Sequence, residues 1–67
     1  MIGDNIRLYR IKKGLTQEAL ALEIGITQGA VWQWENGRST PATTKLKEIA
    51  SCLSCTVDDL LKDAKAV

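Results

Sequence analysis

The stretch from Thr16 to Gly37 constrains the fold most, because its order of residue types suits two short helices joined by a tight turn. Leu20 and Ile24 lie one helical turn apart and predict a buried stripe on the first helix. Gly25 suits the left-handed backbone that ends a helix, and Thr27 can cap the next helix by accepting a backbone N–H. We therefore expect one helix to end and another to begin within a few residues.

Ala21 and Ile26 fit the same arrangement. Two helices that cross steeply over a short turn must approach closely, and Ala21 is small enough to leave room for this approach. Ile26 lies between the helices and is predicted to point into the core. The sequence thus predicts a helix-turn-helix motif.

The second helix of this motif, from Gln28 to about Asn36, has two different faces. Helical spacing directs one set of side chains toward the body of the domain, namely Ala30, Val31 and Trp34. The opposite face carries Gln28, Gly29, Trp32 and Gln33. A solvated face is usually rich in lysine and glutamate, whereas this one has a large aromatic side chain and a glycine that weakens a helix by about 1 kcal/mol. We expect a partner to contact this face.

Length and charge limit the class of protein. A chain of 67 residues allows one domain, which we place at residues 1–67 with a folded part at 1–62 and a frayed tail at 63–67. So short a chain leaves little room for an enclosed substrate pocket. The net charge of +1 neither requires nor excludes a nucleic-acid partner. With no apolar run long enough to span a bilayer and no signal-like start, we expect a cytoplasmic protein without membrane contact.

Cys52 and Cys55 form a C-x-x-C pair, which can belong to a zinc or a redox site. Zinc needs about four ligands, and the sequence has no histidine and no second cysteine pair. We expect both cysteines to be reduced, one buried and one partly exposed, with no metal or other cofactor. The sequence also offers no nucleophile with a base beside it and no phosphate-binding glycine loop, so an enzyme is not expected.

Flanking segments predict three more helices. The first should run from Ile2 to Lys13 with Ile6 in the core and Gly14 as its terminator. A fourth helix should begin with Thr40 as its cap and Pro41 at its first position. Its inward stripe should be Leu46, Ile49, Ala50 and Leu53, with Lys45, Lys47 and Glu48 in solvent.

A short last helix should follow. Thr56 and Asp59 have the spacing of a capping box, and the side chains expected to close the core are Val57, Leu60 and Leu61.

Several motifs occur in an order that resembles a known family. They are I-R-x-Y-R, T-Q-x-x-L-A-x-x-I-G-I-T-Q, W-E-N-G-R-x-x-P, L-K-E-I-A and T-V-D-D-L-L, and they extend from about Ile2 to Leu61. This order resembles the Cro/CI-type (XRE-like) helix-turn-helix family of phage repressors and bacterial transcriptional regulators. The resemblance implies an all-α, five-helix, lambda-repressor-like DNA-binding domain that binds operators as a two-fold dimer.

The resemblance also implies roles for individual residues. The expected base contacts come from Gln28, Gly29, Trp32 and Gln33. The expected phosphate contacts come from Gln17, Arg10, Thr27, Asn36, Gly37 and Arg38. It further implies that Gln17 braces Gln28 and that Arg10 forms a salt bridge with Glu35, either as a purely structural pair or with an added phosphate contact. Trp32 can press against thymine methyls or a sugar, or fold back over its own domain.

The sequence predicts a transcriptional regulator that binds specific sequences of double-stranded DNA. We favour a repressor over an activator, and we expect no small-molecule ligand. We expect a homodimer that is weak or forms only on DNA, paired through the loop near residues 55–58 and the region 38–41. Two alternatives keep the fold but add a protein partner: an antitoxin, and a DNA-binding fragment of a larger regulator. The short tail after Leu61 argues against the antitoxin.

Overall fold

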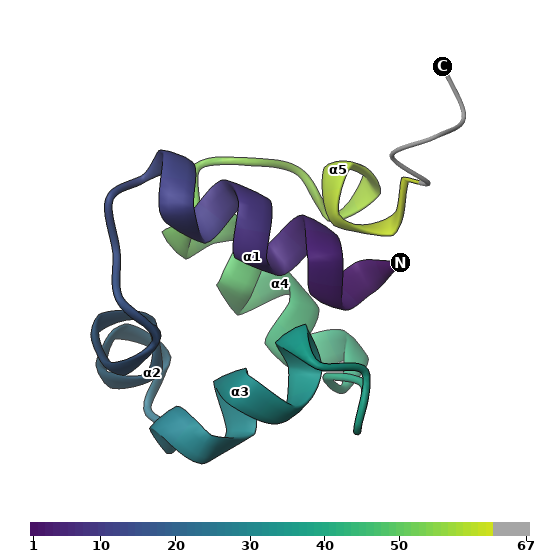
Figure 1. Cartoon of the computed structure of the whole chain (residues 1–67). Coiled ribbons are helices and arrows are strands. Elements are labelled where there is room, and N and C mark those ends of the chain that lie inside the picture. Colours follow the sequence, from purple (N-terminus) through teal and green to yellow (C-terminus); the bar gives the residue numbers. More distant parts are fainter. Residues whose placement is uncertain (63–67) are drawn as a thin grey trace.

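The computed structural model describes residues 1–62, which form five helices (Figure 1). The helices are α1 (Ile2–Lys12), α2 (Gln17–Ile24), α3 (Gln28–Glu35), α4 (Thr43–Cys52) and α5 (Val57–Leu61). The all-α prediction is confirmed. The tail predicted at 63–67 lies outside the described residues.

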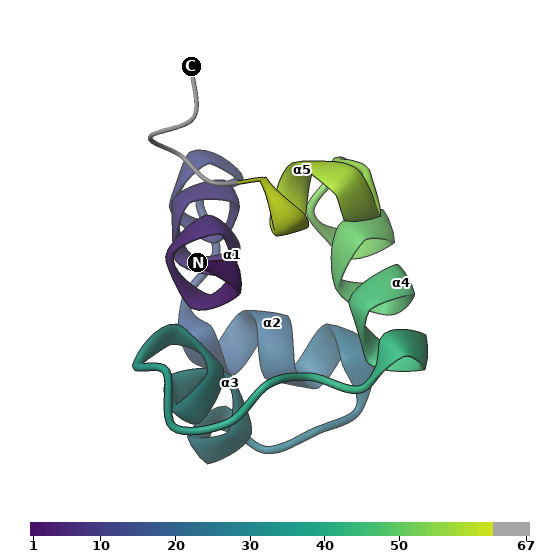
Figure 2. The same ribbon diagram turned by 90° about the vertical axis from the view of Figure 1, so that its right-hand side faces the viewer.

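The helices surround one core. Figure 2 shows α1 and α4 on opposite sides, with α5 at one end and α2 and α3 at the other. In keeping with this view, α3 packs on α1 and α2, α4 packs on α2 and α5, and α5 also packs on α1. Helices α2 and α3 therefore form one end of the domain, and α3 has one side left free of other helices.

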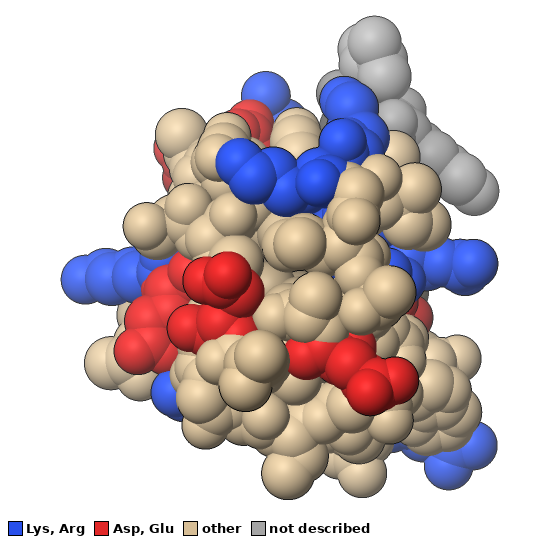
Figure 3. All heavy atoms as spheres, turned by 90° about the vertical axis from the view of Figure 1, so that its left-hand side faces the viewer, with Lys and Arg blue, Asp and Glu red and all other residues tan. Residues whose placement is uncertain are grey.

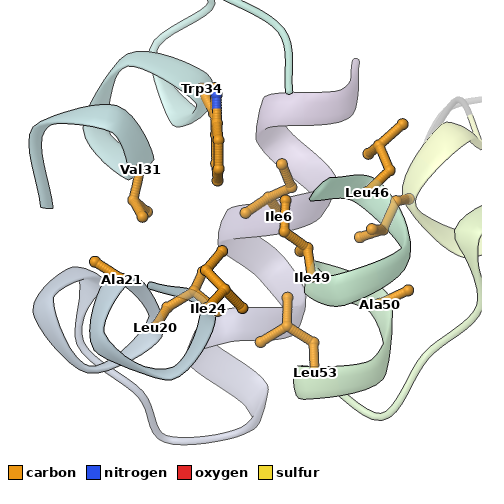
Figure 4. Packing of buried hydrophobic residues seen from close by; sticks show 11 residues of the cluster. Ile6, Leu20, Ala21, Ile24, Val31, Trp34, Leu46, Ile49, Ala50 and Leu53 are labelled. Carbon is orange, nitrogen blue, oxygen red and sulfur yellow. The ribbon is translucent and has the colours of Figure 1, made fainter. Parts of the chain in front are cut away.

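Each helix supplies one fully buried side chain to the core, and these are Ile6, Leu20, Val31, Ile49 and Leu60. Around them lie further buried residues, among them Trp34 and Ala21 (Figure 4). Figure 4 shows Val31 and Trp34 projecting from α3 into the interior, as the inward stripe of the sequence predicted. The stripe predicted for α4 is buried as well.

The residues that cap and end the helices around the turn between α2 and α3 are the predicted ones. Thr16 begins α2 by accepting the amide of Ala19 at 3.0 Å, and Gly25 ends it with a left-handed φ of 72°. Thr27 then caps α3 by accepting the amide of Ala30 at 3.2 Å. The helix-turn-helix prediction is confirmed.

The predicted start of α4 is wrong by two residues. Pro41 is buried within the connecting loop, and α4 begins at Thr43 with Ala42 as an N-cap that has no side-chain hydrogen bond. The Pro41 ring thus helps to fix the loop against the domain, and the chain remains extended through Ala42 before it turns into the helix.

Two further side chains lie elsewhere than expected. Leu61 is 52% exposed, because two consecutive residues of a helix point about 100° apart and Leu60 takes the inward position. Lys45 was predicted to be solvated, but its side chain is only 35% exposed and pairs with Glu48 at 3.0 Å. Its Nζ also donates to the Ile24 carbonyl at 3.3 Å, which satisfies one of the free carbonyls at the end of α2.

Cys52 and Cys55 are both free thiols, and both are partly buried. The prediction that one of them would be fully buried is therefore wrong. Burial raises the pKa of each thiol, and the negative charge of Glu23 near Cys52 and of Asp59 near Cys55 adds to the rise. Cys52 ends α4 and Cys55 lies in the loop before α5, where each covers the edge of the core.

Two contacts of α1 were not anticipated from the sequence. The buried Asn5 donates from Nδ2 to the Leu60 carbonyl at 2.8 Å and also to the Lys62 carbonyl. These bonds tie α1 to the end of α5. At Gly3, a Cβ atom would overlap the Trp34 carbonyl oxygen, so α1 and α3 approach each other through this glycine.

Candidate nucleic-acid interface

The free side of α3 exposes the four residues predicted to read bases: Gln28, Gly29, Trp32 and Gln33. The Trp32 side of this face is held by two contacts. The Arg38 guanidinium lies 5.8 Å from the centroid of the Trp32 ring, and the Asn36 side chain donates to the Trp32 carbonyl at 2.9 Å. With 43% of its surface exposed, Trp32 remains accessible to a partner rather than buried in its own domain.

A chain of side-chain hydrogen bonds leads from α1 to the first residue of α3. Arg10 donates from Nε to Glu35 Oε2 at 2.6 Å and from Nη2 to Glu35 Oε1 at 3.0 Å. Gln17 donates from Nε2 to Glu35 Oε1 at 3.1 Å, and Gln28 donates from Nε2 to Gln17 Oε1 at 2.7 Å. The predicted ion pair and the predicted brace of Gln28 are thus both present, and Glu35 joins them into one network.

Arg10 is largely directed into the protein. Its side chain is 11% exposed and that of Glu35 is 2% exposed. A third donor, Nη1, binds the Leu15 carbonyl at 2.7 Å and so fixes the linker before α2. Three of the five N–H donors of the guanidinium are therefore used within the domain.

An open cleft of about 230 Å³ lies beside this network, and its lining residues are Arg7, Arg10, Gln17, Trp32, Glu35 and Asn36. A second cleft next to it shares Arg7, Glu35 and Asn36 and reaches Gly37. Arg7 was not among the residues singled out from the sequence, although it is exposed and belongs to the I-R-x-Y-R motif. Its position one turn before Arg10 on α1 is the signal that was available.

The arrangement of helices and the order of motifs agree with a known family, whose model, described as helix-turn-helix, matches residues 6–60. The chain belongs to this Cro/CI-type helix-turn-helix family. Its members are DNA-binding regulators of transcription rather than enzymes, as the sequence predicted.

Relatives in this family include both activators and repressors. The chain is 33% identical over 65 residues to the transcriptional activator BcrR of Enterococcus faecalis and 34% identical over 62 residues to repressor protein C2 of Salmonella phage P22. These matches cover 97% and 92% of the chain, but only 32% and 29% of the two relatives. The chain therefore spans about a third of their length.

Solved structures of the family match the fold closely. The P22 c2 repressor in complex with a synthetic operator has a TM-score of 0.87 at 34% identity, covering 92% of this chain and 94% of that one. The biofilm regulator SinR in complex with DNA has a TM-score of 0.86 at 30% identity, covering 92% of this chain and all of that one (100%). These likenesses confirm the lambda-repressor-like fold that the sequence predicted.

The remaining residues predicted to contact phosphate surround the exposed face of this helix-turn-helix. Gln17 is the first residue of α2 and Thr27 caps α3, so both lie at helix N-termini, where backbone N–H groups favour anions. Asn36, Gly37 and Arg38 follow α3 and are all exposed. The structure thus brings the predicted residues to one side of the domain, while their contacts with DNA stay a prediction.

Charge is unevenly placed on the surface. On the face seen in Figure 3, acidic side chains gather across the middle and basic ones lie mainly toward the edges. The lower end of that view, at the level of α3 in Figure 1, is mostly uncharged. An uncharged surface with amide groups suits base edges in a groove better than it suits a purely electrostatic contact.

Among residues 1–62, no three histidine, cysteine, aspartate or glutamate side chains come together in a way that could hold a metal ion. No helix in the same part of the chain is long and apolar enough to cross a membrane.

Proposed function

We propose that the chain is a transcriptional repressor that recognises a palindromic operator by inserting α3 into the major groove. The observation that carries this proposal is the exposed α3 face, which begins with a glutamine held in place by a second glutamine. The major groove admits an α-helix and displays donor and acceptor patterns that amide side chains match. The P22 c2 repressor in complex with a synthetic operator and SinR in complex with DNA support DNA as the ligand.

Base readout is assigned to the α3 face. Gln28, at the N-terminal end of the helix, is matched to adenine, because its amide can donate to N7 and accept from N6. Gln33 lies more than one turn further along and reads a neighbouring base pair. Trp32 contacts thymine methyls or a sugar, and Gly29 lets the helix approach the bases closely.

Phosphate contacts are assigned to the rim of this face. The proposed set is Gln17, Arg10, Thr27, Asn36, Gly37 and Arg38, and the lining of the cleft adds Arg7. Because Arg10 already uses three donors within the domain, its part in this set is mainly to hold the α1 end of the rim in place.

A palindromic operator has two half-sites, so two copies of the chain must bind it together as a dimer. We assign dimerisation to the exposed parts of the two regions expected from the sequence, which are Thr56 and Asp58 in one and Arg38 to Thr40 in the other. Pro41 is buried and is left out of this surface. Two bound copies must place their α3 helices about 34 Å apart in successive major grooves. Sedimentation should therefore give a monomer or weak dimer without DNA, and a tight nanomolar dimer would contradict this assignment.

We favour repression over activation, because repression requires only that the protein occupy the operator. The alternative of a regulator with a protein partner is favoured by one observation, that the chain spans about a third of BcrR and C2. A reporter assay separates the two, because a chain that binds its operator but does not lower transcription by itself needs a further partner.

The decisive experiment is selection of bound sites from random duplex DNA, followed by three substitutions. Gln28→Ala should cost about 1 to 3 kcal/mol on the selected site and much less on random DNA, since it removes a base contact. Arg38→Ala should weaken both kinds of binding by similar amounts. Trp34→Ala removes a core side chain that is 7% exposed and should lose about 3 kcal/mol or more of folding stability.

The outcomes separate readout from folding. A palindromic selected site would support the proposed dimer on DNA. If folded Gln28→Ala kept the same ratio of specific to random binding, the assignment of the α3 face to base recognition would have to be abandoned.

A further inference from the structure

We propose that Trp32 is a positioning residue for Arg38: its indole ring holds the Arg38 guanidinium beside α3 in the orientation in which it binds a DNA phosphate. Trp32 thereby contributes to affinity for DNA of any sequence, in addition to the contact with thymine methyls or a sugar assigned to its own ring. The inference rests on the proposed function and deepens it, because it concerns how the same face holds the DNA backbone.

The end of α3 brings Arg38 back toward Trp32. Gly37 has a left-handed φ of 72°, which reverses the chain after the helix. The Arg38 amide then donates to the Gln33 carbonyl at 2.8 Å, so the backbone of Arg38 is tied to the last turns of α3. The Trp32 carbonyl accepts both the backbone amide of Asn36 at 3.0 Å and its side chain at 2.9 Å. The backbones that carry the ring and the guanidinium are therefore both fixed.

In the described part of the chain, an aromatic ring rather than a hydrogen bond orients the Arg38 side chain. Its guanidinium carbon lies 5.8 Å from the centroid of the Trp32 ring, within the range of a cation–π contact. Within residues 1–62, the Arg38 side chain makes no hydrogen bond and no ion pair. A ring face occupies none of the five N–H donors of a guanidinium, so all of them are left for a partner. Arg38 is thus oriented without losing any capacity to bind phosphate.

Arg10 shows the contrast between a structural arginine and a binding one. It gives three N–H groups to acceptors within the domain, and its side chain is 11% exposed. Arg38 is exposed, and an exposed arginine loses rotamer freedom when a partner orders it. The Trp32 ring restricts this freedom before DNA arrives and so lowers the cost of ordering the side chain. Replacing Trp32 should therefore weaken binding even where no base is read.

The test is a double-mutant cycle of Trp32→Leu and Arg38→Ala, with affinity measured on random duplex DNA, where phosphate contacts dominate. Trp32→Leu should weaken binding about two- to fivefold when Arg38 is present, which is the value of an exposed cation–π contact. In the Arg38→Ala background the same change should have little effect, because the ring then has no guanidinium to hold. Equal losses in the two backgrounds, or no loss in either, would overturn the inference.

The matched control is Gln33→Leu, which alters a neighbouring side chain of the same face and leaves the ring in place. Its effect on random DNA should be the same with and without Arg38, and a coupling as large as that of Trp32→Leu would contradict a specific role of the ring. Thermal melting of each variant shows whether it is folded. If Trp32→Leu does not fold, Trp32→Gln at the same half-exposed position takes its place in the cycle.

A second measurement does not depend on DNA. In the free protein, the ring current of Trp32 should shift the nuclear magnetic resonance signals of the Arg38 side chain, and Trp32→Leu should return them to the values of an ordinary exposed arginine. If the wild-type chain binds no DNA, the proposed function fails, while this measurement still decides whether Trp32 holds Arg38. Arg38 signals that are the same in the wild type and in Trp32→Leu would overturn the inference.

Discussion

Gly3 and Gly29 are both helical glycines, but they meet different surroundings. A Cβ at Gly3 would overlap the Trp34 carbonyl oxygen, whereas a Cβ at Gly29 would meet only Thr27 Oγ1 at 3.9 Å. Gly3→Ala should therefore destabilise the fold by about 1 to 3 kcal/mol through overpacking. Gly29→Ala should stabilise it by up to about 1 kcal/mol, because alanine favours the helix.

The two alanine variants form a matched pair for denaturant unfolding. Each adds one methyl group to a helix, so a difference in helix propensity alone would move both midpoints upward. If the denaturant midpoint of Gly3→Ala were equal to or above that of the wild type, α1 would be able to shift away from α3 without loss of stability.

At this scale the sequence predicted the residues whose type is distinctive and missed those whose role depends on a neighbour. Gln17, Gln28, Arg10 and Glu35 were assigned together because the order of motifs resembles a family. Gly3 could not be assigned, because a glycine near a chain start carries no sign of a carbonyl from another helix. The network through Glu35 also needed coordinates, since it joins residues from three helices.

Among the elements, α5 depends on α1 through Asn5. Its side chain binds the Leu60 and Lys62 carbonyls, and its removal leaves these groups at the helix end without that partner. Asn5→Ala should cost about 1 to 3 kcal/mol of stability. Amide hydrogen exchange should accelerate most in α5 and least in α2 and α3. A uniform acceleration would show that α5 does not open independently of the rest.

The start of α5 should respond to acid. Hydrogen bonds from the Thr56 backbone and side chain lower the pKa of Asp59 from its ordinary 3.8, and the Lys62 charge lowers it slightly further. Because this pKa is lower in the folded state, its stabilising effect is present above pH 3.8 and is lost as the pH falls through the lowered value. In Asp59→Asn, the free energy of unfolding should therefore fall less steeply as the pH is lowered than it does in the wild type.

Thr56 provides the control for this prediction. Thr56→Ser keeps the hydroxyl that accepts from Asp59 at 3.0 Å and should retain the acid response, whereas Thr56→Ala should reduce it. The measurement is urea unfolding between pH 2 and pH 6. An identical pH dependence in Asp59→Asn and the wild type would show that the capping box does not lower the pKa of Asp59.

Helix positions were largely predictable because glycine, threonine and apolar spacing are local signals. The start of α4 was not, because Thr40 and Pro41 carry the usual signal of a helix start while burial of the proline ring decides otherwise. Leu61 was misplaced for a similar reason. In a helix of five residues, periodicity is too short to distinguish the inward leucine from its neighbour.

For the whole molecule, the balance of charge predicts how binding depends on salt. The chain has nine basic and eight acidic residues, and one of the arginines near the α3 face is paired with Glu35. Each phosphate neutralised adds about 0.9 to the slope of log affinity against log salt. We expect a slope of only a few units per dimer, measured by titration of the selected operator at several salt concentrations. A slope of about ten, or none, would show that the phosphate contacts have been misassigned.

The open space around Gly29 has a consequence for how such a regulator changes over generations. A Cβ atom at this position meets no neighbour that it must displace, and the core lies on the other side of α3. Mutation here can therefore alter the outward surface while the rest of the domain keeps its stability. On the proposed assignment of the α3 face to base recognition, a single codon change at Gly29 would alter the target without requiring a compensating change in the core.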